Sequence, residues 1–292
     1  MTSDPVHSNA PSIVVVGSVN LDLVASVTRL PTPGETVTNA SMAQHPGGKG
    51  ANQALAAHRL GADVALLACV GDDPNAEQAL ALLQADGVNL DGCLVDPDAP
   101  TGLALIAVDS KGENQIVVAP GANRSLHARK LNLPKADALI CQLEIPIPAV
   151  RKAVKEFEGF VCINLAPATD IPDEILNAAD LIVVNQTEAA FYGDRLNQIS
   201  ALVVITLGAE GAKLLRNNKI IAIAHPPSIQ AIDATGAGDT FTAALTVALI
   251  EGQDHSKALD FACAAGACTA TKAGAQTSLP WRGEVERLLE NL

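Results

Sequence analysis

Short apolar runs alternate with helical segments along most of this chain. Residues 13–16 form a β-branched run with no polar alternation, which predicts a central strand buried on both faces. Residues 64–70 have the same character, and residues 76–85 predict a helix that ends near Gly87. Further short apolar runs follow at residues 139–143, 161–165, 181–184 and 202–207, and residues 258–270 predict a helix of small residues. This alternation predicts an α/β fold built on a parallel sheet.

Two stretches interrupt the alternation. Residues 101–108 and 115–118 are strand-like runs joined by a polar segment that contains glycine, which indicates a β-hairpin. Earlier, residues 18–24 and 35–44 suggest two exposed strands on either side of a Pro/Gly turn. We therefore expect a single domain over residues 1–292 with a small second sheet, built from insertions at about residues 19–44 and 97–119. Such a sheet would serve as a lid.

Asn20 and Asp22 alternate with apolar residues, so their side chains would share one face of a strand. Taken alone, this spacing indicates the solvated face of an edge strand. The alternative is a pair of ligands for hydroxyl groups, because a carboxylate only accepts hydrogen bonds whereas an amide both donates and accepts.

The stretch 233–241 predicts a junction at which a helix begins. Gly236 and Gly238 allow a tight turn, and the amides of Gly236, Ala237 and Gly238 would point out of the helix N-terminus, where anions bind. Asp239 is either an ordinary acidic residue of the first helical turn or a general base beside a transferring phosphoryl group.

A second glycine-rich loop, residues 45–54, opens another predicted helix. It lacks the spacing and the Lys-Ser/Thr ending of a P-loop, so it better suits the approach of a polyhydroxy ligand to bare backbone around Gly48 and Asn52. Lys49 either contacts phosphate or substrate, or is a solvated loop lysine.

Polar residues follow several predicted strands. In an open parallel sheet the carboxyl ends of the strands line the ligand crevice, so we expect these residues to lie on one edge. Each alone is compatible with ordinary capping or turn chemistry. They are Gln142, Glu144, Asn164, residues 185–188 and residues 206–211.

Composition narrows the class of protein. Hydrophobic residues make up 48% of the 292 residues and charged residues 17%, as in a globular protein. The net charge of -13 argues against a nucleic-acid surface. Six cysteines without a C-x-x-C pair indicate buried free thiols, not a disulfide framework or a zinc site. Residues 1–12 lack the features of a signal peptide, and no apolar run reaches the ~18 residues of a membrane helix. We expect a cytoplasmic protein without a membrane partner.

Several of these motifs, in this order, resemble the PfkB-type carbohydrate kinases. The similarity covers nearly the whole chain, through residues 17–22, 47–54, 233–241, 274–276 and 280–282. The resemblance implies a Rossmann-type three-layer α/β sandwich with a small β-sheet lid that also commonly joins two subunits into a homodimer. It implies ATP-dependent phosphorylation of a sugar hydroxyl, with Mg²⁺ required and K⁺ as activator.

The resemblance also implies roles for individual residues. Asp239 matches the catalytic base, and Gly236, Ala237 and Gly238 match the anion hole. The sugar contacts are Asn20, Asp22, Gly48, Lys49, Asn52 and Glu144. The nucleotide positions are Asn185, Thr206, Leu207, Gly208, Ala209, Glu210, Gly211 and Gly238, and Glu188 matches the magnesium network. The monovalent-cation positions are Asp233, Thr235, Thr269, Lys272, Gly274 and Ser278.

The motif around Asn20 and Asp22, together with residues 48–52, favours D-ribose as the sugar, with D-ribose 5-phosphate and ADP as products. Other acceptors of the same family, such as fructose, deoxyribose or adenosine, are alternatives, and so is a non-catalytic sensor of sugar or nucleotide.

The sequence departs from the family pattern in one place. Residues 189–204 are shorter than the corresponding stretch of related kinases, which usually contains an additional helix beside the nucleotide side of the site.

Overall fold

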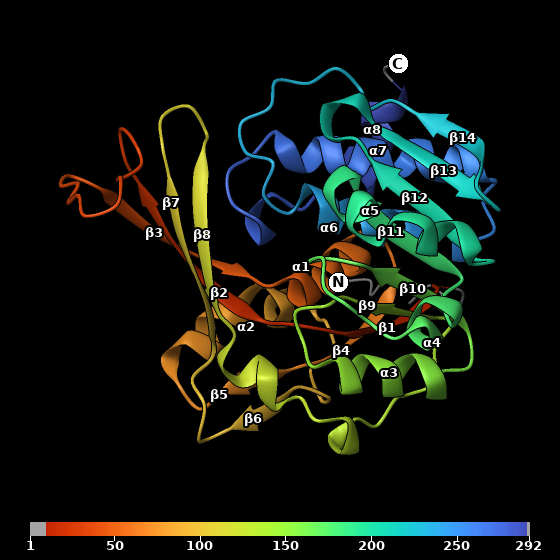
Figure 1. The fold of residues 1–292 in the computed structure, drawn as a ribbon, viewed down its shortest axis with the longest axis horizontal. Coiled ribbons are helices and arrows are strands. Elements are labelled where there is room, and N and C mark those ends of the chain that lie inside the picture. Colours follow the sequence, from red (N-terminus) through yellow and green to blue (C-terminus); the bar gives the residue numbers. More distant parts are fainter. Residues whose placement is uncertain (1–9, 291–292) are drawn as a thin grey trace, which may run out of the picture.

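The computed structural model describes residues 10–290 and shows a central sheet between two layers of helices (Figure 1). The sheet has eight strands in the order β14-β13-β12-β11-β10-β9-β1-β4. The first six strands from the β4 end are parallel, whereas at the other edge β13 pairs antiparallel with both β12 and β14. Their bounds are β1 (Ser12–Val16), β4 (Asp63–Leu67), β9 (Ala138–Cys141), β10 (Phe160–Asn164), β11 (Leu181–Asn185), β12 (Leu202–Thr206), β13 (Ala212–Arg216) and β14 (Lys219–Ala224).

The parallel strands are apolar because helices cover both of their faces. One face packs against α1 (Lys49–Arg59), α2 (Pro74–Asp86), α6 (Ala237–Ile250), α7 (His255–Ala270) and α8 (Arg282–Glu290). The other face packs against α3 (Ile147–Glu156), α4 (Asp173–Asn177) and α5 (Gln186–Tyr192). The predicted three-layer α/β sandwich is confirmed.

A second sheet of four strands stands beside this body, in the order β3-β2-β7-β8. It joins β2 (Asn20–Ser26) and β3 (Ser41–Gly47) to the hairpin of β7 (Gly102–Val108) and β8 (Asn114–Ala119). Strand β2 pairs with β3 on one side and with β7 on the other, so it is not the edge strand that the spacing of Asn20 and Asp22 suggested. Both side chains are buried.

Some predicted boundaries were wrong. The run 64–70 is not one strand: it divides at Ala68 into β4 of the main sheet and β5 (Cys69–Gly71), which pairs with β6 (Leu94–Asp96). The strand expected over residues 35–44 begins at Ser41 and continues to Gly47, so the glycine-rich loop starts inside a strand. Periodicity alone could not find these limits, because strand pairing sets them.

Five short 3-10 helices complete the described elements: η1 (Gly121–Ser125), η2 (Ala128–Lys130), η3 (Gly193–Gln198), η4 (Gly208–Glu210) and η5 (Gln276–Ser278). All six cysteines are free thiols in the structure. Within residues 10–290, no helix is both long enough and apolar enough to cross a bilayer.

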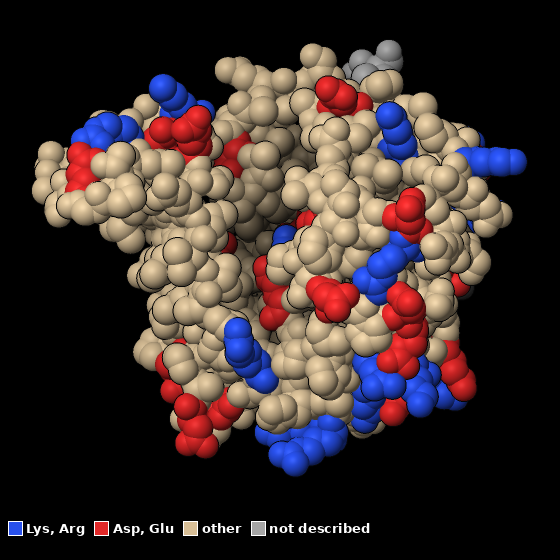
Figure 2. Space-filling view, viewed as in Figure 1, with Lys and Arg blue, Asp and Glu red and all other residues tan. Residues whose placement is uncertain are grey.

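Figure 2 shows a cleft between the four-stranded sheet and the main body, with acidic and basic side chains at its floor. The carboxyl ends of the parallel strands, the start of α1 and the start of α6 meet at this cleft.

Candidate active site

Strand β2 places two polar side chains on the same face at the base of the second sheet. Asn20 is 3% exposed and Asp22 is 9% exposed. The orientation of the Asn20 amide is set by Asn123, whose Nδ2 donates to Asn20 Oδ1 at 2.8 Å. Asn123 is itself held by Val19, since its Oδ1 accepts from the Val19 amide and its Nδ2 also donates to the Val19 carbonyl. Asn20 therefore keeps its own Nδ2 available as a donor to a ligand.

The turn from β3 into α1 has room only for glycine. A Cβ at Gly47 would lie 2.3 Å from Asp22 Oδ2. Gly48 has φ +89°, and a Cβ there would lie 2.7 Å from the Asn20 amide nitrogen. The backbone of this turn thus packs directly against the two polar side chains of β2, as expected where a small ligand approaches bare backbone.

The start of α1 also reaches the presumptive base. Asn52 Nδ2 donates to Asp239 Oδ2 at 2.9 Å, and Gln53 Nε2 donates to Asp239 Oδ1 at 2.9 Å. Asp239 is 7% exposed and lies in the first turn of α6. Both carboxylate oxygens are therefore held by amide donors from α1, which packs against α6.

Glu144 follows β9 and bonds to the segment after β1 and to the first residue of α1. Its Oε2 accepts from Ser18 Oγ at 2.5 Å and from the Lys49 amide at 3.2 Å. These two bonds join the carboxyl ends of neighbouring strands β1 and β9 to the start of α1.

Four carboxylates lie around one lysine in this cleft. The charge of Asp239 raises the pKa of Lys49 above its usual range, with Glu144, Glu188 and Asp22 adding to the effect, although burial opposes it. Lys49 is therefore a stable cation in the cleft and not a solvated loop lysine.

Asp22 has the most perturbed carboxyl group of the cleft. Burial, followed by repulsion from Glu144 and Asp239, raises its pKa to about 7, while Lys49 opposes the shift. A carboxyl group poised in this way would favour a partner that donates a hydrogen bond to the ionised form, such as a hydroxyl group.

A cavity of about 540 Å³ lies between β12, the segment 226–231 and helices α6 and α7. Its wall is largely apolar, with Phe241, Cys263, Gly266 and Ala267 from the two helices. Of the predicted nucleotide residues, it is lined by Thr206, Gly208, Ala209, Gly211 and Gly238. Leu207 and Glu210 do not line it; Leu207 is half-buried and Glu210 is exposed.

A smaller cavity of about 220 Å³ continues from the first one toward Asp239. The two share Thr206, Ala234 and Gly238, and the smaller one adds Lys49, Glu188 and Asp239, with Asn164, Ala166, Val183, Val184, Asn185 and Gly236 completing its wall. Asp239, Lys49 and the start of α6 therefore meet at one end of a continuous cleft.

The start of α6 has the form of an anion site, with one correction. Gly236 is the N-cap residue at φ +80°, and no described residue accepts a hydrogen bond from the amides of Gly236 or Gly238. The Ala237 amide instead donates to the Ala234 carbonyl at 3.1 Å. Two of the three predicted donors are free for an anion, while the third closes the turn that precedes the helix.

Asn185 and Glu188 form a capping box at the start of α5. Asn185 Oδ1 accepts from the Glu188 amide, and Glu188 Oε2 accepts from the Asn185 amide, each at 2.8 Å. Burial raises the pKa of Glu188 despite the Asn185 hydrogen bond. Glu188 is thus oriented toward the smaller cavity by local helix chemistry, with one carboxylate oxygen free.

The predicted monovalent-cation positions lie on two loops that Asp233 holds together. Its Oδ2 accepts from the Gly274 amide, and its Oδ1 accepts from Thr235. Although burial opposes the shift, the hydrogen bonds from Thr235 and Gly274 lower the pKa of Asp233. The Lys272 side chain points away to Glu284 on α8, so only its backbone carbonyl could serve a cation.

The remaining two predicted cation positions are Thr269 and Ser278, whose hydroxyl groups are hydrogen-bonded within the protein. The Thr269 side chain is buried against Thr240, and its carbonyl accepts from the Lys272 amide. Ser278 Oγ donates to the Ala275 carbonyl at 2.7 Å. The donors near Asp233 are all oxygens, which suits a hard cation. Among residues 10–290 no cluster of three or more His, Cys, Asp or Glu side chains could hold a metal by itself.

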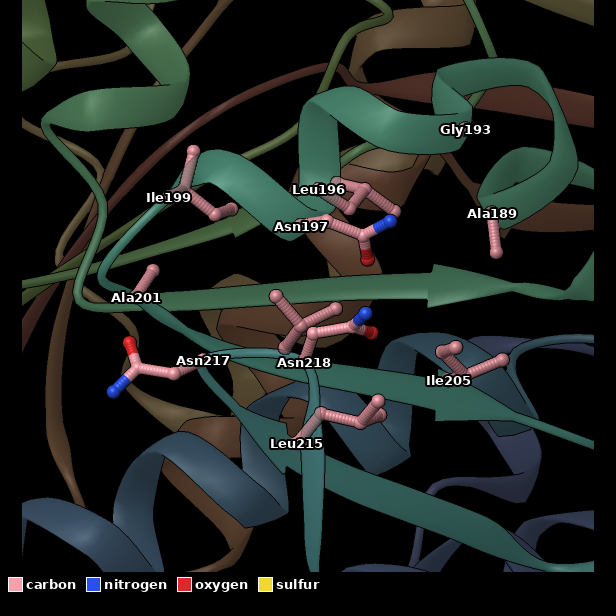
Figure 3. A pocket seen from close by; sticks show the side chains of 11 residues that line it. Ala189, Gly193, Leu196, Asn197, Ile199, Ala201, Ile205, Leu215, Asn217 and Asn218 are labelled. Atoms are coloured by element: carbon pink, nitrogen blue, oxygen red, sulfur yellow. The ribbon is translucent and has the colours of Figure 1, made fainter.

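The shortened stretch 189–204 contains the end of α5, the 3-10 helix η3 and the start of β12, without the additional helix. A pocket of about 140 Å³ lies there, lined among others by Leu196, Val203 and Ile205 (Figure 3). That the missing helix lies beside the nucleotide side of the site stays a prediction. Val203 packs with the α3–α5 layer, whereas the large cavity lies against α6 and α7 on the other face of the sheet.

The structure also adds residues that sequence reasoning did not assign to the site. Ser18, Gln53 and Asn123 make buried hydrogen bonds to Glu144, Asp239 and Asn20 respectively. Gln53 follows Asn52 on the predicted helix, but adjacent helical residues point in different directions, so spacing gave no reason to link it to Asp239. Asn123 lies in a short 3-10 helix that no periodicity marks.

Comparison with known proteins decides the family. The model of the pfkB family carbohydrate kinases matches residues 10–282. The chain belongs to this family. This PfkB-family chain is 38% identical over 292 residues to the ribokinase of Bacillus subtilis, covering 95% of this chain and 99% of that protein. It is 37% identical over 295 residues to a bifunctional ribokinase/ribose-5-phosphate isomerase A of Fructilactobacillus sanfranciscensis, of which it spans 54%.

Among solved structures, this PfkB-family chain resembles the Arabidopsis thaliana ribokinase complexed with ribose and ATP. The TM-score is 0.84 at 31% sequence identity, and the match covers 97% of this chain and 99% of that one. The fold is therefore the ribokinase-like α/β fold, with a mixed central sheet between two helical layers.

Proposed function

We propose that this chain is an ATP-dependent kinase that phosphorylates D-ribose at O5, giving D-ribose 5-phosphate and ADP. One observation carries the proposal. Asp239 lies between the sugar-facing residues and the anion site: it accepts from Asn52 and lines the smaller cavity beside Gly236 and Gly238. The similarity to ribokinases over nearly the whole chain supports ribose as the acceptor.

The sugar would bind against β2 and the turn at Gly47 and Gly48. Asp22 would accept a hydrogen bond from one hydroxyl, and Asn20 would donate to another, because Asn123 occupies its Oδ1. Asn52 and Glu144 would complete the contacts on the side of α1 and β9. Fixing several hydroxyls at once places one of them near Asp239.

In the transfer step, Asp239 would take the proton of the O5 hydroxyl while O5 forms a bond to the γ-phosphorus. The bond between that phosphorus and the β–γ bridging oxygen breaks, and ADP leaves. The free amides of Gly236 and Gly238 and the cation of Lys49 would stabilise the negative charge on the transferring group. The adenine of ATP would occupy the apolar cavity between α6 and α7.

The donor set also suits the two metal ions that the resemblance implies. Mg²⁺ would be held mainly by the ATP phosphates with help from Glu188, which lines the smaller cavity beside Asp239. It would supply charge neutralisation on the phosphates. K⁺ would lie between the loops that Asp233 joins, and would act by ordering the turn before Gly236.

The four-stranded sheet is proposed as a lid and as the contact of a homodimer. Its outer strand β8 has an unpaired edge, and Ile116, Val117 and Val118 are exposed at 54%, 64% and 47%. Exposed apolar side chains on a free edge strand indicate a protein contact. Light scattering of the wild type and of Val117→Glu would test this, since the dimer is expected only in the wild type.

We propose a cytoplasmic location and no nucleic-acid or membrane partner.

The proposed function is tested by ADP release from ATP and Mg²⁺, with and without K⁺, across D-ribose, 2-deoxyribose, fructose and adenosine. We expect ribose to give the highest kcat/KM and K⁺ to raise it. A preference for another acceptor would leave the fold and Asp239 in place but overturn the sugar assignment. No turnover with any acceptor would favour a sensor.

A further inference from the structure

A chain of buried side-chain amides runs behind Asp239, and of its three members only Asn164 lines the ligand cleft. Gln142 Nε2 donates to Gln53 Oε1 at 2.5 Å. Gln53 Nε2 then donates both to Asp239 Oδ1 at 2.9 Å and to Asn164 Oδ1 at 3.1 Å. Gln53 and Gln142 are fully buried, and Asn164 is 7% exposed.

The direction of each hydrogen bond follows from the two acceptors that face Gln53, Asn164 Oδ1 and the Asp239 carboxylate. Asn164 Nδ2 donates to the Val183 carbonyl, so Asn164 Oδ1 must face Gln53. The Asp239 carboxylate only accepts, so it also requires a donor. Both acceptors receive a hydrogen bond only when Gln53 directs its Nε2 at them. The Oε1 of Gln53 then faces the Gln142 amide.

Gln142 is held in this orientation by close packing. Its Oε1 lies against the Gly17 backbone, where a Cβ would come within 2.1 Å. That oxygen has no hydrogen-bond partner among the described residues. If the Gln142 amide turned over, its oxygen would face Gln53 Oε1, and two acceptors would meet. The observed orientation therefore leaves Gln142 Oε1 unpaired, and it keeps Gln142 Nε2 donating to Gln53 and Gln53 Nε2 donating to Asp239.

We propose that Gln53 is a positioning residue for the base Asp239, and that Gln142 and Asn164 hold Gln53 in the required orientation. This inference rests on the proposed function, because it assigns Asp239 the proton of the acceptor hydroxyl. Asn52 holds Oδ2 from the sugar side and Gln53 holds Oδ1 from the protein interior. Together they stop the carboxylate from rotating, and a small misplacement of a base is costly to the rate.

Gln53 acts through Asp239 and not on the substrate. It lines neither cavity of the cleft and has no exposed surface. Its removal should therefore change the chemical step while leaving sugar and nucleotide binding intact.

The test is Gln53→Met, which keeps the length of the side chain and removes the donor. We expect kcat for ribose to fall about 10- to 100-fold, with KM for ribose and ATP within about twofold of the wild type. The acid-side midpoint of the kcat profile should move to higher pH, because the ionised carboxylate loses a donor. Gln142→Met should produce the same changes on a smaller scale, and it provides the test if Gln53→Met does not fold.

Thr246→Val is the matched control. It removes a buried hydroxyl from the same core, which bonds to the Thr242 carbonyl in α6 and to the Cys162 side chain. We expect a lower Tm and an unchanged kcat and pH profile. The positioning role is overturned if Gln53→Met keeps a normal kcat, if it raises KM instead, or if Thr246→Val lowers kcat equally. An inactive wild type would overturn the proposed function itself, and is recognised before any variant is compared.

Discussion

The α-carbon of Gly47 on β3 packs against the carboxylate of Asp22 on β2, so that a Cβ at position 47 would lie 2.3 Å from Asp22 Oδ2 and 2.5 Å from Oδ1. The two residues belong to neighbouring antiparallel strands. Any side chain at position 47 must therefore displace the carboxylate that we assign to a sugar hydroxyl.

Gly47→Ala should raise KM for ribose at least about tenfold, the size expected when one buried hydrogen bond to a ligand is lost. Gly283→Ala is the control, because a Cβ there meets no heavy atom within 4 Å and neither glycine has a positive φ. Steady-state kinetics on both variants, with Tm as a check of folding, would decide. Equal KM values in the two variants would contradict the placement of the sugar against Asp22.

Asp239→Asn should lower kcat about 10²–10⁴-fold, the range for a lost general base, with a modest change in ribose affinity. An amide at this position would also direct N–H groups at the donors of Asn52 or Gln53, so Asp239→Ala is a useful second variant. Ribose binding by calorimetry separates affinity from turnover. Near-normal turnover in either variant would remove Asp239 as the base.

The ligand-free protein should become less stable as the pH rises, through Asp22. Its pKa is about 7 when folded, above the ordinary value of 3.8, so between these values the folded state binds a proton that the unfolded state releases. The free energy of unfolding therefore falls as the pH rises through this window.

Asp22→Asn removes this contribution. The difference in Tm, Asp22→Asn minus wild type, should be larger at pH 8 than at pH 5. Asp91→Asn, an exposed carboxylate before β6, serves as the control and should show no such difference. If the Tm difference between Asp22→Asn and the wild type is the same at both pH values, burial does not shift the pKa of Asp22.

Asn123→Ala should raise KM for ribose several-fold while leaving kcat nearly unchanged. Without Asn123, nothing else among the described residues holds the oxygen of the Asn20 amide, which can then turn its donor away from the sugar. This outcome is the reverse of that expected for Gln53→Met, so the two variants measured together separate binding from the chemical step. A loss of kcat in Asn123→Ala would show that the two amides are not independent.

Ala267→Phe should raise KM for ATP and leave KM for ribose unchanged, because the new ring fills the apolar cavity between α6 and α7. Cys93→Ser offers a control outside the cavity lining. Isothermal binding of ADP would confirm the loss of affinity directly. If Ala267→Phe retains normal nucleotide affinity, the adenine lies elsewhere.

The sequence by itself determined the α/β class, the parallel pairing of the strands at the centre of the sheet and the start of the helix at residues 236–239. Local rules suffice for these features. Unbroken β-branched runs such as 13–16 must be buried on both faces, and the glycines before Asp239 leave few alternatives to a tight turn into a helix. The motifs also marked Asn20, Asp22, Asn52 and Asp239 as candidates for one site.

Only the tertiary structure decided which of these residues meet. Asn52 and Gln53 are far from Asp239 along the chain, at separations of 187 and 186 residues. Their contact depends on the packing of α1 against α6. The same is true of Asn123, which reaches Asn20 only because β7 pairs with β2 and its hairpin partner β8 leads into η1. Hydrogen bonds between distant segments leave no periodicity in the sequence, so neither the amide chain behind the base nor the packing of Gly47 against Asp22 could be predicted from it.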